Sequence, residues 1–404
     1  MTLGDRGPQV PLLTIAREWG RIGCIGFGGP PAHLTLLRKL CVDQRGWLSA
    51  EEFEDGVAAA NLLPGPASTQ LAIFCAWRLA GPAGAIIGGA CFILPGLVVI
   101  LALASLFLAT HPPLWVSGAA AGAGAAVPAV AIAAAIALMP ASWSRAGGAL
   151  SEHRAEARQP RLRWLGYLLA GAVAALAAGT LLVIVLAACG LIEVAVRARE
   201  SRIQDGKGGA GRSRALLPLA IVAPPAMGGL LALAWVAFKV GALSYGGGFV
   251  IVPLMQHDAV GTYHWMTGAQ FLSAVALGQV TPGPVVQTVA VVGYAAAGLG
   301  GGLLASLIAF TPSFVFVLAG ARRFAVLRRS ARVQAFLTGA GPAAIGAIAG
   351  SAVPLGLELA HLWQLAALGL AVGWLIGLRK SVVTAIVGAA CLGIIAALAG
   401  APIG

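Results

Sequence analysis

Two stretches of the chain, residues 61–70 and 279–288, place an amide side chain before a Pro-Gly-Pro turn and a polar patch after it. In a soluble protein this pattern is a turn, but in apolar surroundings it predicts a helix broken inside a membrane. The helix after the break then presents free N–H groups and a partial positive charge, which suit an anion. The predicted breaks are Pro64, Gly65, Pro66, Pro282, Gly283 and Pro284, and the predicted anion-binding side chains are Asn61, Ser68, Thr69, Gln70, Gln279, Thr281, Gln287 and Thr288.

Two cations, Arg21 and Lys239, lie in apolar surroundings shortly before glycine pairs that predict two further breaks, Gly28-Gly29 and Gly246-Gly247. A cation at membrane depth is costly, which makes both residues candidates for anion transport. The alternative is that both side chains extend to opposite membrane interfaces. Three titratable residues are candidates for proton coupling: His33, Glu54 and Asp55. The alternatives are a structural histidine and acidic residues at a solvated helix start.

The composition identifies a membrane protein. Of the 404 residues, 59% are hydrophobic and 10% are charged, against about 25% charged in soluble domains. Apolar runs long enough to cross a bilayer recur, including 83–109, 114–139 and 303–321. The net charge of +12 comes from basic residues in short loops, which indicates cytoplasmic loops rather than nucleic-acid binding.

The chain shows no P-loop, no nucleophile motif and no cluster with metal-ligand spacing, so we expect neither an enzyme nor a bound cofactor or metal. The six cysteines form no CxxC motif and are expected to be buried, small apolar residues.

The second half of the chain repeats the first. Lys239 follows Arg21 by 218 residues (239 − 21 = 218), and at this offset the glycine pairs, Trp47 and Trp265, and the Pro-Gly-Pro turns all coincide. A one-residue deletion changes the offset to 217 and pairs Pro95 with Pro312. Such a duplication is typical of secondary transporters.

The basic residues predict that the copies are inverted. The loop at 38–46 is basic, whereas its counterpart at 256–264 has no Lys or Arg, so the first loop is expected in the cytoplasm and the second outside. We predict an all-α polytopic membrane protein with broken, re-entrant helices and a cytoplasmic N-terminus; fully crossing segments are the alternative. The predicted parts are a first repeat at 1–196, a basic linker and topology-inverting helix at 197–230, and a second repeat at 231–404. Further spans are expected near 164–178 and 181–196.

Several motifs resemble those of the chromate ion transporter family. They are Phe27-Gly28-Gly29-Pro30-x-Ala32-His33, Trp47-Leu48-Ser49-x-Glu51-x-Phe53, Asn61 to Ile73, Gly246-Gly247-Gly248, Gly278 to Pro284, and Pro312-Ser313-Phe314. The resemblance implies a bacterial inner-membrane carrier of two homologous halves that exports chromate, driven by the proton gradient. The family's first motif often ends in Ser-Thr-Glu, whereas this chain has Gln70, so that carboxylate cannot couple protons here.

The expected partners are the lipid bilayer, protons and a small inorganic oxyanion, either chromate or sulfate, with a homodimer left open. An anion channel of the same architecture is the alternative function, and it would conduct without saturation or coupling. A membrane enzyme or a scaffold subunit has no supporting set of residues.

Overall fold

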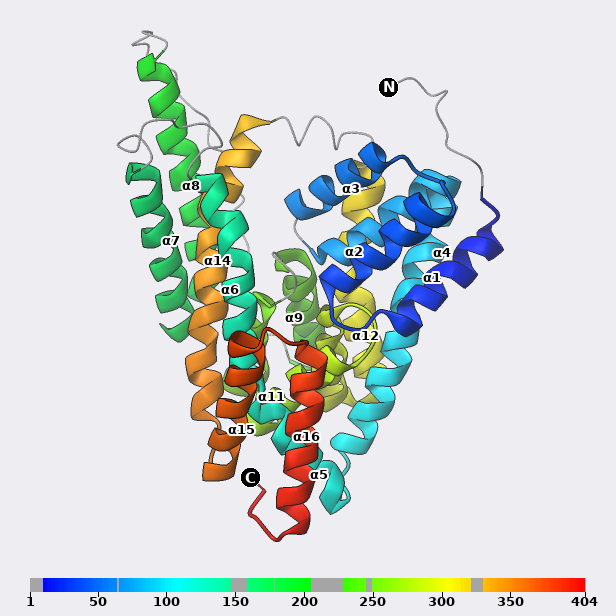
Figure 1. Ribbon diagram of the computed structural model, residues 1–404, viewed down its shortest axis with the longest axis vertical. Helices are drawn as coiled ribbons and strands as arrows, with labels where there is room; N and C mark the ends of the chain where they lie inside the picture. The colour runs from blue at the N-terminus through cyan, green and yellow to red at the C-terminus, as the bar shows by residue number, and fades with distance from the viewer. Residues whose placement is uncertain are drawn as a thin grey trace.

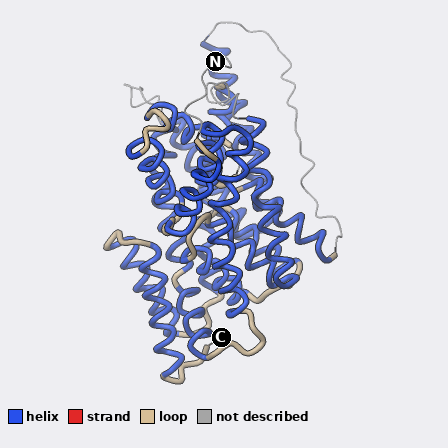
Figure 2. The backbone as a smooth tube through the Cα atoms, turned by 90° about the vertical axis from the view of Figure 1, so that its right-hand side faces the viewer, coloured by secondary structure: helices blue, strands red, loops and turns tan. Residues whose placement is uncertain are grey.

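The computed structural model describes residues 10–63, 65–146, 158–177, 179–204, 228–244, 249–320 and 330–403, and these residues form helices and connecting loops without a strand (Figures 1 and 2). The first half contains α1 (Leu12–Ile25), α2 (Pro30–Arg38), η1 (Lys39–Gln44), α3 (Ala50–Leu62), α4 (Ala67–Phe107), α5 (Leu114–Ala125), α6 (Val127–Ala146), α7 (Arg158–Ala177) and α8 (Gly179–Gln204). The second contains α9 (Gly229–Leu243), α10 (Ile251–Gln256), η2 (His257–Thr262), α11 (Gly268–Val280), η3 (Val285–Gln287), α12 (Thr288–Gly320), α14 (Ala331–Leu357), α15 (Leu362–Val372), η5 (Gly373–Gly377) and α16 (Val382–Leu398).

Four of the described helical segments are long and apolar enough to cross a membrane: Ala67–Phe107, Leu114–Ala146, Val285–Gly320 and Ala331–Leu357. The predicted all-helical membrane class is confirmed. Most of the predicted linker and inverting helix lies outside the described residues, so the predicted domain boundaries stay a prediction.

The internal duplication is visible in the backbone. The π-helical turns η1 and η2 lie 218 residues apart (257 − 39 = 218). A sharp kink interrupts α4 at Ala80-Gly81 and α12 at Ala297-Gly298, where Gly81 and Gly298 share a φ of 63°. Only glycine adopts this left-handed geometry without strain, so the sequence enforces the same kink twice.

The helices before the Pro-Gly-Pro turns begin alike in the two halves as well. Ser49 caps α3 and Thr267 caps α11, and each cap forms a capping box with the residue three positions later, Glu52 or Gln270. Each box satisfies N–H groups at the start of the helix that leads to the break.

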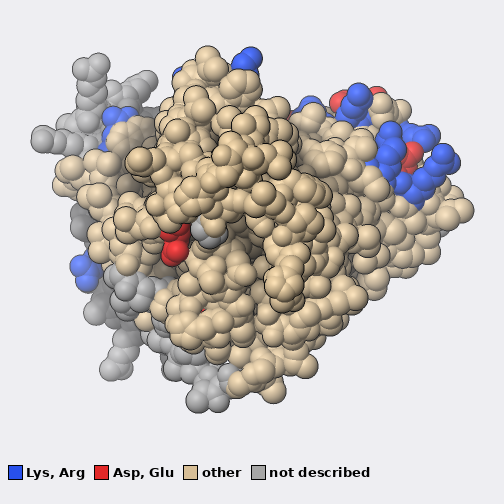
Figure 3. Space-filling model, turned by 90° about the horizontal axis from the view of Figure 1, so that it is seen from below, with Lys and Arg blue, Asp and Glu red and all other residues tan. Residues whose placement is uncertain are grey.

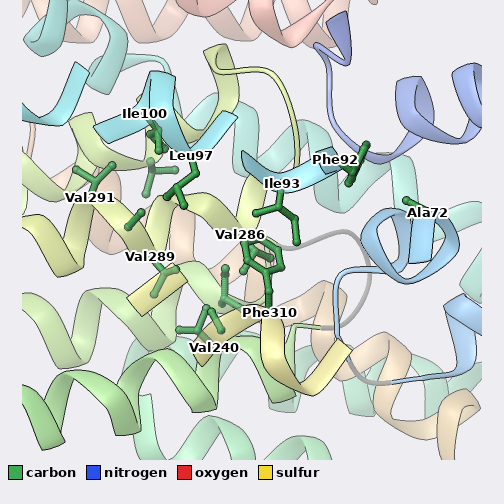
Figure 4. Close-up of a cluster of buried hydrophobic side chains, with 14 of the residues drawn as sticks. Ala72, Phe92, Ile93, Leu97, Ile100, Val240, Val286, Val289, Val291 and Phe310 are labelled. Atoms are coloured by element: carbon green, nitrogen blue, oxygen red, sulfur yellow. The ribbon is translucent and has the colours of Figure 1, made fainter. Parts of the chain in front are cut away.

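The two halves meet where α4 packs against α12, at the centre of the largest apolar core. Figure 4 shows Phe92, Ile93 and Leu97 of α4 among Val286 of η3 and Phe310 of α12. The second bundle, at the left of Figure 1, is built by α14 against α6, α7 and α8. Its helices approach closely through glycine: a side chain at Gly171 or Gly346 would overlap the backbone of the neighbouring helix, as is usual where helices pack in membranes.

Helices α7 and α8 extend well beyond the predicted spans. The prediction ended them near the charged residues, but the structure continues both helices and pairs those charges with one another. Arg163 contacts Glu193 and Glu200, and Arg197 contacts Glu193 at 2.8 Å. These ion pairs join the ends of the helices beyond the apolar segments.

The face seen from below in Figure 3 is mostly uncharged, with basic side chains confined to its margins. The hairpin of α1 and α2 lies at the right of the molecule in Figure 1, with α3 above it.

Candidate substrate site

The two Pro-Gly-Pro turns break the chain at glycines in the left-handed region. Gly65 has a φ of 122° and Gly283 a φ of 94°. The first turn separates α3 from α4, and Pro66, which precedes α4, supplies no side-chain cap. The first N–H groups of α4 are therefore without the usual side-chain acceptor, which leaves them available to an anion.

Each turn is held by the other half of the molecule. The Gly65 N–H donates to the carbonyl oxygen of Ser244 at 2.8 Å, and the Gly283 N–H donates to the carbonyl oxygen of Gly26 at 3.0 Å. Ser244 is the counterpart of Gly26 at the 218-residue offset, so the two hydrogen bonds are equivalent by the internal symmetry. The Pro-Gly-Pro break of each half thus contacts the residue that ends α1 or α9 in the other half, and we call this meeting point the crossing.

The long helices α4 and α12 also contact the crossing, each at the Pro-Gly-Pro break of the other half. On α4, a side chain at Gly96 would overlap the Pro282 carbonyl oxygen. On α12, Ser313, the counterpart of Gly96, places its Oγ 3.1 Å from the position that a Cβ of Gly65 would take. Both breaks are therefore enclosed by helices of both halves.

Buried polar atoms without a hydrogen-bond partner gather at this crossing. Among the described residues they include Thr69 Oγ1, Ser244 Oγ, Ser313 Oγ, Gln279 Nε2 and Gln287 Oε1. Buried polar groups are rarely left unsatisfied, because each one costs about 1–3 kcal/mol. A concentration of such atoms around an uncapped helix start is what a site for a polar ligand requires.

The structure buries most of the residues predicted to bind the anion. Ser68, Thr69 and Gln70 lie in the first turn of α4, all buried. In the second half, Gln287 donates through Nε2 to the Ile93 carbonyl oxygen at 2.6 Å, which leaves Oε1 free. Asn61 differs from its counterpart Gln279, because Asn61 is exposed and Gln279 is buried.

The hydroxyls of Thr281 and Thr288 are already used. Thr281 donates to the Leu277 carbonyl oxygen and Thr288 to the Val285 carbonyl oxygen, each at 2.9 Å. Each hydroxyl has lone pairs left, but its single hydrogen is engaged with the backbone.

The two predicted cations have different surroundings. Arg21 is about half exposed and pairs at 2.9 Å with Glu18, which also pairs with Arg45. Lys239 is largely buried and pairs at 2.7 Å with Asp258, which is also buried. The structure therefore joins Arg21 and Lys239 to separate carboxylates rather than bringing them together.

Among the proton-coupling candidates, His33 contacts the crossing directly. Its ring is fully buried, and Nε2 lies 2.9 Å from the Gly26 carbonyl oxygen, the same oxygen that accepts the Gly283 N–H. Glu54 is exposed and pairs with Arg38 at 3.3 Å, and Asp55 lies beside it on α3 at intermediate exposure.

The predicted glycine-pair break is present at Gly28 and Gly29, with φ values of 97° and 72°. Pro64, Gly246 and Gly247 were also predicted as helix breaks, and they lie outside the described residues.

Comparison with known proteins gives a consistent result. The sequence model of the family described as "Chromate transporter" matches residues 13–194 and 231–394, once in each half. The chain belongs to the chromate transporter family. A "Chromate transport protein" of Cupriavidus metallidurans is 32% identical over 356 residues, which cover 86% of this chain and 83% of the relative.

Two further relatives carry similar names. A "Probable chromate transport protein" of Synechococcus elongatus is 27% identical and covers 88% of this chain and 87% of its own. A "Chromate transport protein" of Pseudomonas aeruginosa is 28% identical and covers 83% of this chain and 79% of its own. No solved structure matches the chain.

Membership of the chromate transporter family identifies the protein as a transporter rather than an enzyme. Within the described part of the chain, no group of three or more His, Cys, Asp or Glu side chains is placed to hold a metal ion. The crossing thus offers neutral donors and backbone N–H groups rather than catalytic or metal-binding chemistry.

Sequence reasoning missed Ser244, Ser313, Glu18 and Asp258. The two serines differ from their counterparts, Gly26 and Gly96, and that difference was visible in the repeat alignment. No sequence signal announced Glu18 and Asp258 as the partners of the two cations, because those pairings depend on how separate segments pack.

Proposed function

We propose that this member of the chromate transporter family exports chromate from the cytoplasm and that the proton gradient drives the export. The crossing of the two Pro-Gly-Pro breaks is the proposed binding site. The observation that carries the proposal is the set of buried, unpartnered polar atoms around the uncapped start of α4. The donors among them, the hydroxyls and Gln279 Nε2, would be satisfied by hydrogen bonds to an ionised oxyanion, which contribute about 1.5–3 kcal/mol each.

The break geometry supports a carrier. A helix broken at the centre of an inverted repeat is the usual binding element of secondary transporters, because both halves can rock around it. The equivalent hydrogen bonds of Gly65 and Gly283 give the two halves the same contact with each other. A tilt of one half relative to the other can therefore open the site first to one side of the membrane and then to the other.

We place the protein in the bacterial inner membrane with the N-terminus in the cytoplasm. The basic loop 38–46 then lies inside and the loop 256–264, which has no Lys or Arg, outside. The segments around the breaks support re-entrant hairpins, since α1, α2 and α3 are 14, 9 and 13 residues long, whereas a spanning helix needs about 20.

The direct test is chromate accumulation in cells with and without the protein. Export driven by protons lowers accumulation, saturates with chromate concentration, and is abolished by a protonophore. Equal accumulation with the protein present in the membrane would refute chromate export, and flux that neither saturates nor responds to the protonophore would identify a channel. Competition by sulfate tests whether other oxyanions share the site.

Proton coupling is assigned to His33 because its ring contacts the Gly26 carbonyl oxygen, which belongs to the crossing. In the His33→Asn variant, export should lose its dependence on the proton gradient, whereas Glu54→Gln, which alters an exposed ion pair, should retain it. Full gradient-dependent export by His33→Asn would remove this assignment.

A further inference from the structure

Two Pro-Gly-Pro breaks meet at the crossing, the first at Gly65 and the second at Gly283. They are alike in backbone but differ in the side chains around them. The second half contributes Ser244 and Ser313 to the first break, and the first half contributes the counterparts Gly26 and Gly96 to the second break (244 − 26 = 218; 313 − 96 = 217). The duplication has therefore kept the contacts in both halves, whereas hydroxyl side chains are present at the first break and replaced by glycine at the second.

Three residues that carry hydroxyl groups lie next to the first break. Ser244 carries the carbonyl that accepts the Gly65 N–H, Ser313 Oγ lies against Gly65, and Thr69 lies in the first turn of the following helix. All three residues are fully buried, and none of the three hydroxyl oxygens has a hydrogen-bond partner among the described residues. Each hydroxyl can rotate to donate one hydrogen bond to an anion.

The second break has none of these hydroxyls. At the 217-residue offset the counterpart of Thr69 is Val286, which is buried in the apolar core. A side chain at Gly96 would overlap both the Pro282 carbonyl oxygen and the Gln287 amide, so backbone and amide already fill the volume there. The two hydroxyls beside it already donate to the backbone, Thr281 to the Leu277 carbonyl oxygen and Thr288 to the Val285 carbonyl oxygen.

We infer that the protein has one oxyanion subsite rather than two, that it lies at the first break, and that Ser244, Ser313 and Thr69 are its side-chain donors. The ligand class is a tetrahedral dianion such as chromate or sulfate, which accepts hydrogen bonds from the three hydroxyls and from the first N–H groups of α4. The second break serves as the packed pivot against which the first one moves. This inference rests on the proposed function and specifies its site.

The test is direct binding to purified protein in detergent, with chromate and sulfate as separate probes, for wild type, Ser244→Ala, Ser313→Ala and Thr69→Val. Each variant should bind about tenfold more weakly or worse, since a hydrogen bond to a charged group is lost. The melting temperature without ligand should stay unchanged or rise, because removing an unpartnered hydroxyl takes nothing from the folded state. A structural role would lower it instead.

Ser351→Ala is the matched control. Ser351 is equally buried, lies on α14 in the second bundle, and donates to the Ile348 carbonyl oxygen at 2.7 Å. Wild-type dissociation constants in the three site variants would overturn the inference while leaving chromate export intact, and so would an equal loss in Ser351→Ala. Sulfate binding that depends on the serines, without chromate binding, would support the subsite and refute chromate as substrate. Wild-type protein that binds neither anion would overturn both.

Discussion

The hairpins around η1 and η2 have the same backbone conformation in the two halves but carry different side chains. In the first half, Arg45 stacks over Trp47 and pairs with Glu18. In the second, Tyr263 occupies the position of Arg45 and stacks on Trp265, with ring centroids 4.7 Å apart. The π-helical turn, the capping box and the tryptophan recur because they shape the chain, whereas the charges differ because they need to suit only one side of the membrane.

The same comparison holds for ion pairs. The first half has an exposed pair, Arg38–Glu54, and a partly buried one, Arg78–Glu52. The described part of the second-half hairpin has the Lys239–Asp258 pair, which is buried. A peripheral pair is worth little, whereas a buried one becomes costly when it is broken.

The largest expected effect concerns which side of the membrane each hairpin faces. Gln44 and Thr262 are exposed counterparts in the two π-helical turns. In a background with the exposed cysteines Cys24 and Cys391 replaced by alanine, a membrane-impermeant thiol reagent should label Thr262→Cys in intact spheroplasts, and Gln44→Cys only after permeabilisation. Labelling of both from one side would show that the halves are not inverted.

The next largest effect is expected at the buried ion pair. Lys239→Met leaves the Asp258 carboxylate buried without its partner, and we expect a loss of about 3–5 kcal/mol, read as a lower melting temperature in detergent. Arg21→Met should cost less than about 1 kcal/mol because its side chain is half exposed.

The double variant Lys239→Met/Asp258→Leu is the control, since it removes both charges and should recover most of the stability. It also isolates transport: loss of export by this stable double variant supports the predicted role of Lys239 in moving the anion. Normal export would leave Lys239 with a structural role only.

A smaller effect should separate the two break glycines. Alanine at either position forces a side chain into the left-handed region, at about 1–3 kcal/mol. At Gly65 the added Cβ would also overlap the Gln70 amide, whereas at Gly283 its nearest neighbours lie 3.7–3.9 Å away. Gly65→Ala should therefore reduce both stability and export more than Gly283→Ala, and equal effects would contradict the structure at the first break.

The smallest expected effect is at the caps. Ser49→Ala and Thr267→Ala should each cost about 1 kcal/mol, because each removes the same capping bond. Glu52→Gln converts the first box into the form of the second and replaces the partly buried charged pair with Arg78 by a neutral contact, so we expect a change of about 0.5–1 kcal/mol. Melting curves of the three variants test whether the caps contribute as expected. A loss in Glu52→Gln larger than that of the cap variants would show that the Arg78 pair contributes more to stability than a capping bond.

Most of the helical architecture could be predicted from local patterns. Apolar run length predicts the spans, and glycine and proline predict the breaks at Gly28, Gly65 and Gly283, because these residues act on the backbone wherever they occur. The ends of α7 and α8 were misjudged, since the ion pairs that carry them past the apolar segment form between residues far apart in the chain.

By itself, the sequence determined that this protein is a membrane-embedded helical duplication with paired broken helices, because hydropathy, repeat spacing and glycine geometry are local properties. The tertiary structure alone decided which break meets which, that Lys239 is paired with Asp258 while Arg21 remains half exposed, and that Ser244 and Ser313 face the first break. These contacts join residues of opposite halves or of separate helices, and no spacing along the chain encodes them.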